Sequence, residues 1–101
     1  MATHLLDDAA ITEALRDLPD WRLESADQSS LTLTAKLPSF TAAIEVVDRV
    51  AEVAERADHH PDIDIRYNTL SFRCSTHSEG GITAKDIDLA NAISELIAAR
   101  S

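Results

Sequence analysis

Hydrophobic residues recur with two different periods along the chain, and the change from one period to the other divides it into seven predicted elements. In three stretches they return every three or four positions, which is typical of helices with one apolar face. The apolar positions of the three predicted helices are Ile11, Ala14, Leu15 and Leu18; Phe40, Ala43, Ile44, Val47, Val50, Ala51 and Ala54; and Ile87, Ala90, Ile93, Leu96 and Ile97. We expect these helices to end near residues 18, 57 and 99.

Polar residues and prolines mark the ends of these helices. Side chains that favour N-cap positions precede each one, namely Asp7 or Asp8, Ser39 and Thr83. Pro19 ends the first helix. Pro61 ends the second, because the residue before a proline, here His60, is pushed out of the α region.

Between the helices the period shortens to two, the alternation expected of half-buried strands. Apolar residues alternate with polar ones at Trp21 and Leu23; at Leu31, Leu33 and Ala35; at Ile63, Ile65 and Tyr67; and at Leu70, Phe72, Cys74 and Thr76. Turn-forming residues at 26–30 and around Asn68 separate the members of each pair, so two antiparallel hairpins are expected. Residues 77–81 are expected to form a loop before the last helix.

The order of elements is therefore α-β-β-α-β-β-α, which predicts an α+β fold in one domain spanning residues 1–101. The simplest arrangement is a four-stranded antiparallel sheet with three helices packed on one face. Such an open sheet leaves two edge strands that a short chain has little left to cover. Pairing of edges across a two-fold axis would cover them, so a homo-oligomer is expected.

Acidic residues outnumber basic ones, with eighteen Asp and Glu against nine Lys and Arg and a net charge of −9. This charge repels phosphate backbones and anionic lipids, which disfavours nucleic-acid binding and attachment to a membrane. Residues 1–8 lack the pattern of a signal peptide, and no window approaches the ~18 apolar residues of a transmembrane helix. The single cysteine, Cys74, permits no intramolecular disulfide, so a cytoplasmic protein is expected.

Candidate chemistry centres on three of the four histidines, which stand at the ends of predicted elements, where functional side chains often lie. His59 and His60 follow the second helix, and His77 follows the fourth strand. In an antiparallel sheet the end of the fourth strand can lie beside the start of the third, so His77 is expected near the other two. Asp86, in the first turn of the last helix, can reach the same cluster.

Each of these residues also has a purely structural explanation. Two histidines at a helix C-terminus are favourable against the helix dipole. Asp86 stands three residues after Thr83, the position from which an acidic side chain completes a capping box. Glu55 fits a solvated helix residue, and Trp21 at the start of a strand fits the core more readily than a binding surface.

Metal binding and covalent catalysis fit the pattern less well than acid–base chemistry. Consecutive histidines rarely converge on one ion, and the chain has neither a His-x-x-x-His spacing nor a cysteine pair, so no metal site is predicted. Cys74 lies on the apolar side of a strand and is expected to be inert. Imidazoles titrate near neutrality, so one can donate a proton while another accepts one, which suits elimination of water without a cofactor. A carboxylate such as Asp86 or Glu55 can orient an imidazole and fix its tautomer.

Three motifs frame these residues: Glu55-x-x-Asp58-His59-His60-Pro61, Tyr67-Asn68, and Ser75-Thr76-His77-x-x-Gly80-Gly81-x-Thr83-x-x-Asp86-Ile87-x-Leu89-Ala90. With them the chain closely resembles the pterin-4a-carbinolamine dehydratase family. The resemblance extends from about Leu6 to Leu96 and includes Trp21 and Pro38-Ser39-Phe40. The spacing from His-His-Pro to Thr-His is its most specific part.

The resemblance implies the same α+β fold, joined edge to edge in a homodimer and, through further pairing that involves the helices, in a homotetramer. It also implies dehydration of 4a-hydroxytetrahydropterin to quinonoid dihydropterin, which recycles the pterin oxidised by aromatic amino acid hydroxylases, with no cofactor and no metal. The family's catalytic positions fall on His59, His60, His77 and Asp86, and the substrate-binding positions on Glu55, Asp58, Pro61, Ser75, Thr76 and Trp21. His60 is expected to release the 4a-hydroxyl, while His59 and His77 hold the pterin and handle its N5 proton.

One position departs from the family pattern. Some members carry an aromatic residue two positions after the proline, where this chain has Ile63, so Trp21 or Phe40 would have to supply a stacking surface for the pterin. Family members also act as dimerisation partners of a transcription factor, and relatives act as assembly factors for a large carboxylating enzyme. A non-catalytic binding module on the same fold is therefore the alternative, and an acid–base enzyme for another bicyclic substrate is a third possibility. Because every motif position is filled, the sequence favours catalysis.

Overall fold

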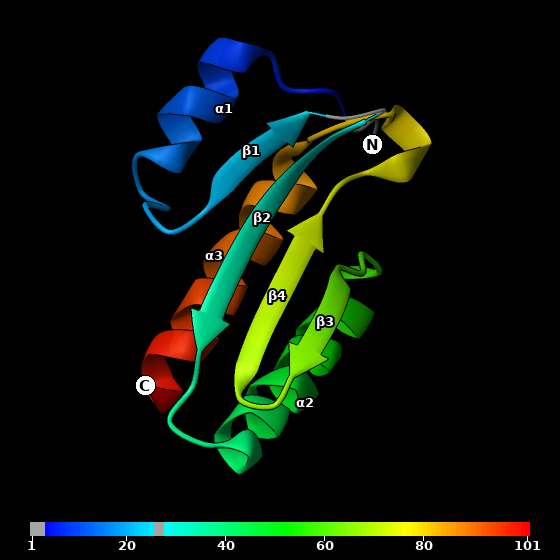
Figure 1. The fold of residues 1–101 in the computed structure, drawn as a ribbon. Coiled ribbons are helices and arrows are strands. Elements are labelled where there is room, and N and C mark those ends of the chain that lie inside the picture. Colours follow the sequence, from blue (N-terminus) through cyan, green and yellow to red (C-terminus); the bar gives the residue numbers. More distant parts are fainter. Residues whose placement is uncertain (1–3, 26–27) are drawn as a thin grey trace.

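The computed structural model describes residues 4–25 and 28–101, and its elements follow the predicted order (Figure 1). The helices are α1 (Asp8–Leu15), α2 (Phe40–Ala57) and α3 (Ala84–Arg100), with a short 3-10 helix, η1 (His77–Glu79), before α3. The strands are β1 (Arg22–Ser25), β2 (Ser29–Lys36), β3 (Asp62–Arg66) and β4 (Thr69–Cys74). The predicted α+β class and its element order are confirmed.

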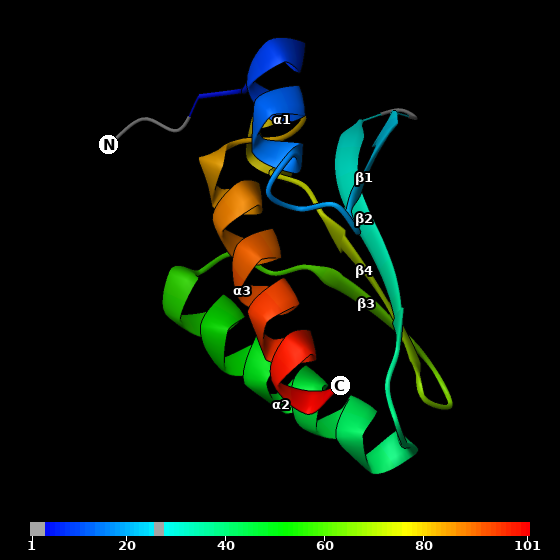
Figure 2. The ribbon, with the colours of Figure 1, turned by 90° about the vertical axis from the view of Figure 1, so that its left-hand side faces the viewer.

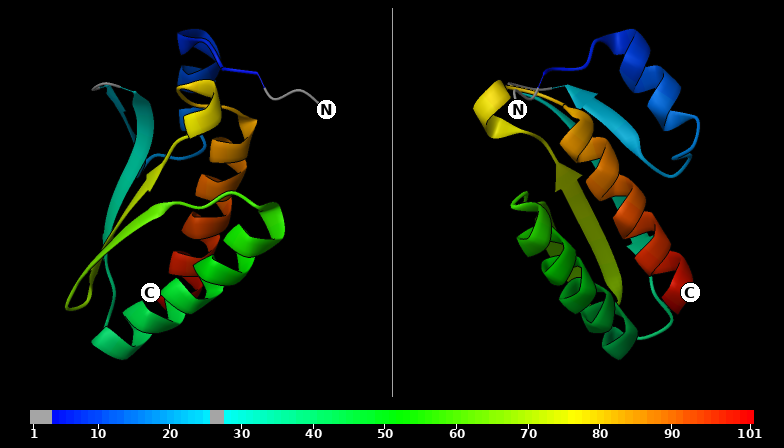
Figure 3. Two further views of the ribbon diagram at one scale, coloured as in Figure 1. Left: turned by 90° about the vertical axis from the view of Figure 1, so that its right-hand side faces the viewer. Right: turned by 180° about the vertical axis from the view of Figure 1, so that it is seen from behind.

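The four strands form one antiparallel sheet in the order β1-β2-β4-β3. The strands β2 and β4 are therefore central, and β1 and β3 are the edges. All three helices lie on the same side of this sheet, as predicted (Figure 2). Two of them, α2 and α3, pack against each other on that side of the sheet (Figure 3).

The core lies between the sheet and the pair α2 and α3. The alternate side chains of β2 and β4 that face the helices are buried there, as the period of two predicts. Its most deeply buried residues include Leu31, Leu70, Phe72, Cys74, Ala43, Val46, Val50, Ala90 and Ile93.

The face that α2 buries differs in part from the predicted one. Val46 is fully buried, whereas Ala51 is exposed and Phe40 is 50% exposed. The inward stripe follows positions 43, 46, 50 and 54, which stay within a narrow sector at 100° per residue. Phe40, in the first turn, instead stacks on Tyr67 in the β3–β4 turn, with 6.4 Å between the ring centroids.

Element boundaries also differ from prediction at several places. The first helix ends at Leu15, because the backbone N–H groups of Asp17 and Leu18 bond to carbonyls three residues back and tighten the chain before Pro19. The strand β2 begins at Ser29, inside the stretch predicted as a turn, and positions 26–27 of that turn lie outside the described residues. The loop predicted over 77–81 contains η1, and α3 continues to Arg100.

Within the ranges 4–25 and 28–101, none of the helices combines the length and the apolar character that crossing a membrane requires.

Candidate active site

The sheet topology brings the three predicted histidines to one place. Because β3 and β4 are antiparallel, with Asp62 opposite Arg73, the chain enters β3 beside the point where it leaves β4. His59 and His60 precede β3, and His77 follows β4. They share a hollow of about 260 Å³, lined by Asp58, His59, His60, Ser75, Thr76, His77, Ser78 and Lys85.

A left-handed residue at the end of α2 sets the direction of the paired histidines. Asp58, the C-cap, has φ 50° and ψ 44°, a conformation that few residues other than Gly, Asn and Asp adopt readily. The N–H of Asp58 bonds to the Glu55 carbonyl and the N–H of His59 to the Ala54 carbonyl, which closes the helix. The chain then turns toward β3, and the two adjacent histidines reach different carboxylates.

His59 is the most enclosed of the three, with only 11% of its side chain exposed. Its Nε2 lies 2.6 Å from Oδ1 of Asp86, whose side chain is fully buried. The other carboxylate oxygen, Oδ2, accepts the backbone N–H of Thr83 at 2.9 Å and so completes the capping box of α3. Asp86 therefore caps α3 and contacts His59 at the same time.

His60 lies at the exposed side of the hollow, with 54% of its side chain accessible. Its Nε2 lies 2.5 Å from Oε2 of Glu55 in the last turn of α2. Glu55 is thus a partner of His60 rather than only a solvated helix residue. Since both side chains are largely exposed, this pair is held less firmly than that of His59 and Asp86.

His77 contacts a residue that the sequence reasoning missed. Its Nδ1 lies 3.3 Å from Nε2 of Gln28, which also donates to Oγ of Ser75 at 2.6 Å. The Ser75 hydroxyl in turn donates to the Ser29 carbonyl at 2.9 Å. An amide nitrogen can only donate, so Nδ1 of His77 accepts and, in the neutral ring, Nε2 carries the hydrogen.

The other residues predicted for the site are divided between the hollow and the core. Asp58, Ser75 and Thr76 line the hollow, and Pro61 follows His60 without being part of its wall. Trp21 is not brought there: its side chain is 4% exposed, and its indole N–H donates to Oγ of Ser94 at 2.8 Å. Ser78 and Lys85 line the hollow but were not predicted.

Neither aromatic residue considered for stacking lies at the histidines. Trp21 is in the core, and Phe40 begins α2, at the end of that helix opposite to His59. Ile63 is half-buried and packs against the core. Within the described part of the hollow, its wall is therefore formed by polar and ionisable side chains.

Cys74 behaves as predicted for a residue of the core. It is fully buried, and this burial raises the pKa of its thiol to about 12, with a further contribution from the nearby Asp86 and Asp62. A neutral buried thiol is a poor nucleophile. Among the residues that the structure describes, no three His, Cys, Asp or Glu side chains are arranged to share a metal ion.

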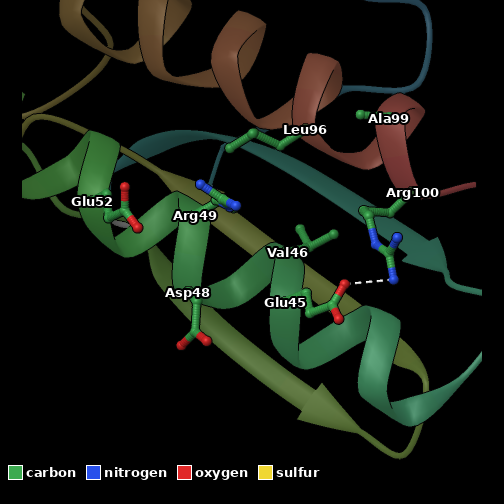
Figure 4. Close-up of a pocket in the computed structure, with 8 residues that line it drawn as sticks. All are labelled: Glu45, Val46, Asp48, Arg49, Glu52, Leu96, Ala99 and Arg100. Atoms are coloured by element: carbon green, nitrogen blue, oxygen red, sulfur yellow. Dashed lines mark ion pairs between the residues drawn. The ribbon is translucent and has the colours of Figure 1, made fainter.

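A second and larger hollow, of about 680 Å³, lies between the helices α2 and α3 (Figure 4). Its rim carries an ion pair of Glu45 with Arg100 at 2.5 Å, and its floor includes Val46 and Leu96. It contains no histidine and lies apart from the hollow around His59.

Comparison with known proteins assigns the chain to a family. Residues 4–96 match the family model described as pterin 4 alpha carbinolamine dehydratase. The chain belongs to this family. It is 60% identical over 96 residues to a Nocardia farcinica (strain IFM 10152) protein provisionally named pterin-4-alpha-carbinolamine dehydratase, covering 95% of this chain and 98% of that protein. A Mycobacterium avium (strain 104) protein with the same provisional name is 50% identical over 93 residues, covering 92% and 96%.

Solved structures show the same fold. A crystal structure described as a transcriptional coactivator/pterin dehydratase from Brucella melitensis is similar with a TM-score of 0.87 and 31% identity, covering 93% of this chain and 99% of that one. A pterin dehydratase-like protein described as a RuBisCO assembly factor in the alpha-carboxysome has a TM-score of 0.66 at 16% identity, over 77% and 89% of the two chains, which is a likeness of fold alone. The predicted family and architecture are confirmed, and membership makes this chain one of a group of hydro-lyases.

Proposed function

We propose that this protein dehydrates 4a-hydroxytetrahydropterin, such as 4a-hydroxytetrahydrobiopterin, to quinonoid dihydropterin and water, as a step of pterin recycling. The observation that carries the proposal is the hollow shared by His59, His60 and His77, with the buried carboxylate of Asp86 against His59. The family to which the chain belongs supports the choice of substrate. Three imidazoles in one hollow supply both an acid and a base near neutral pH.

In the proposed reaction one imidazolium donates a proton to the 4a-hydroxyl, and the C4a–O bond breaks as water leaves. The N5 lone pair forms the new double bond to C4a, and a second imidazole takes the N5 proton. His60 is the proposed acid, since it lies at the exposed side of the hollow where a hydroxyl can leave with solvent. His59 and His77 then hold the pterin, and Nδ1 of His59 is suited to the N5 proton because its Nε2 faces Asp86.

The test is the decay of chemically generated 4a-hydroxytetrahydropterin, followed by ultraviolet absorbance. Wild-type protein should accelerate this decay. In His60→Ala and His77→Ala the acceleration should be about 10²- to 10⁴-fold smaller, while the circular dichroism spectrum stays native. His4→Ala, which changes an exposed histidine outside the hollow, is the matched control and should keep the wild-type rate. The rate should show a bell-shaped pH profile. Wild-type rates in both site variants would refute the proposal.

The alternative is a non-catalytic dimerisation or assembly module on the same fold. The Brucella melitensis relative, described both as a coactivator and as a pterin dehydratase, gives a specific reason to consider it. In that case the wild-type protein would leave the decay rate unchanged. The same assay therefore separates the two functions.

A further inference from the structure

A chain of buried hydroxyl groups lies behind the Asp86 carboxylate, on the side away from His59. Thr76, at 5% exposure, places its Oγ1 2.7 Å from Oδ2 of Asp86 and 2.8 Å from Oγ1 of Thr83. Thr83 is itself fully buried at the N-cap of α3. The predicted role for Thr76 was contact with substrate, but its hydroxyl is occupied within the protein.

The direction of these hydrogen bonds follows from counting protons. The hydroxyl of Thr76 has a single proton, which it donates to Oδ2 of Asp86. The bond between the two hydroxyls must then be donated by Thr83, whose oxygen accepts the backbone N–H of Lys85 at 3.3 Å. The chain thus runs from the Lys85 N–H through both threonines and ends at the carboxylate.

Asp86 consequently has one oxygen committed to the protein and one to His59. Its Oδ2 receives the Thr76 hydroxyl and the Thr83 N–H, and its Oδ1 faces Nε2 of His59 at 2.6 Å. A carboxylate held by two donors on one oxygen cannot rotate without breaking both bonds. The orientation of Oδ1 toward His59 is fixed in this way.

We propose that Thr76 is a positioning residue for the dehydration: its hydroxyl holds Asp86 so that neutral His59 carries its hydrogen on Nε2 and leaves Nδ1 as the proton acceptor. The effect on catalysis rests on the proposed function, whereas the effect on the His59 tautomer does not. Bonds from an outer residue to the partner of an imidazole are known to orient such rings.

The backbone of Thr76 has a separate structural role that the side chain does not share. Its N–H bonds to the Gly81 carbonyl at 2.8 Å, and its carbonyl accepts from the N–H of Glu79 and of Gly80. These bonds fold the loop after β4 whatever the side chain is. Thr76→Val keeps the backbone and the branched shape but removes the hydroxyl, whereas Thr76→Ser keeps the hydroxyl.

The experiment measures the ¹⁵N chemical shifts of the His59 ring together with kcat and KM. Wild type and Thr76→Ser should show neutral His59 protonated on Nε2, and Thr76→Val should show a mixture of both tautomers. Thr76→Val should also lower kcat about ten- to a hundredfold with little change in KM, and Thr76→Ser should restore most of it. If Thr76→Val does not fold, Thr76→Ala carries the same expectations with less bulk at the site.

An unchanged His59 tautomer in both hydroxyl-free variants would overturn the positioning role. So would a kcat equal to that of wild type. A wild-type protein that leaves pterin decay unaccelerated, but in which Thr76→Val shifts the tautomer, would remove the proposed function and keep the hydroxyl chain as the device that orients His59. The two failures are therefore distinguishable.

Discussion

The buried thiol of Cys74 should make the free energy of unfolding of this protein depend on pH in the alkaline range. Burial raises the pKa of this thiol from an ordinary 9.0 to about 12. A group whose pKa is higher in the folded than in the unfolded state contributes its full stability below the unfolded pKa and loses it as the pH rises toward the folded one. Between about pH 9 and 12 this contribution should fall by ~1.4 kcal/mol per pH unit.

Comparison of wild type with Cys74→Ala isolates this effect, since all other groups that titrate at alkaline pH are present in both proteins. At pH 7 the variant should be less stable by about 1 kcal/mol, because the missing sulfur leaves a small cavity. Urea unfolding at pH 7, 9 and 10 should show this difference shrinking above pH 9 and vanishing or changing sign by pH 10. A difference that stays constant to pH 10 would contradict a thiol kept neutral by burial.

At the same scale, the clustering of the three histidines could be predicted from the sequence, but the contact of His77 with Gln28 could not. His59 and His60 adjoin a strand that pairs with the one before His77, so antiparallel pairing suffices to bring them together. Gln28 reaches His77 only because β2 pairs with β4, with Leu31 opposite Cys74. Alternation along the chain shows that strands exist, but it does not show which strands are neighbours.

At the scale of single elements, the left-handed C-cap of α2 leads to a prediction about which residues the histidine turn accepts. At φ 50° the Cβ of an ordinary residue crowds its own backbone, which costs about 1–2 kcal/mol and most for a β-branched side chain. Asp58→Val should therefore lower the free energy of unfolding by about that amount relative to Asp58→Gly.

A matched substitution inside the same helix separates backbone conformation from helix propensity. Asp48 is exposed in the middle of α2, so Asp48→Val should change stability by only a few tenths of a kcal/mol. Urea unfolding of the three variants is the measurement. Equal stability of Asp58→Val and Asp58→Gly would show that the turn adapts without strain.

The elements also show where periodicity stops being informative. It correctly predicts α2 and its N-cap, since Ser39 Oγ accepts the N–H of Ala42 at 3.0 Å. It wrongly includes residues 40 and 51 in the buried face. On the helical wheel these two lie beside positions 43, 46, 50 and 54, but the sheet covers only one side of that sector. Which flank is buried depends on how the helix crosses the sheet, a tertiary property.

At the scale of the whole molecule, the net charge of −9 and the open sheet have opposite effects on the association of copies of the chain. Like charge opposes association of copies, especially at low salt, where its range is longest. The edges β1 and β3 favour association, because each presents backbone groups and a partly exposed apolar side chain, Leu23 at 37% and Ile65 at 41%. We expect the edges to dominate at physiological salt.

Sedimentation velocity at about 0.15 M NaCl should accordingly show a species of at least twice the mass of the chain. The fraction of this species should fall when the salt concentration is lowered, because the repulsion between like charges then acts over a longer distance. A lysine on the edge that forms the interface should reduce this species, since an edge charge blocks strand pairing. Leu23→Lys and Ile65→Lys test the two edges separately. Thr34→Lys is the control, because Thr34 is exposed on β2, which is already paired on both sides. If wild type has the mass of a single chain across this salt range, the sheet edges do not drive association. If only Thr34→Lys loses the larger species, the interface lies on the face of the sheet instead of its edges.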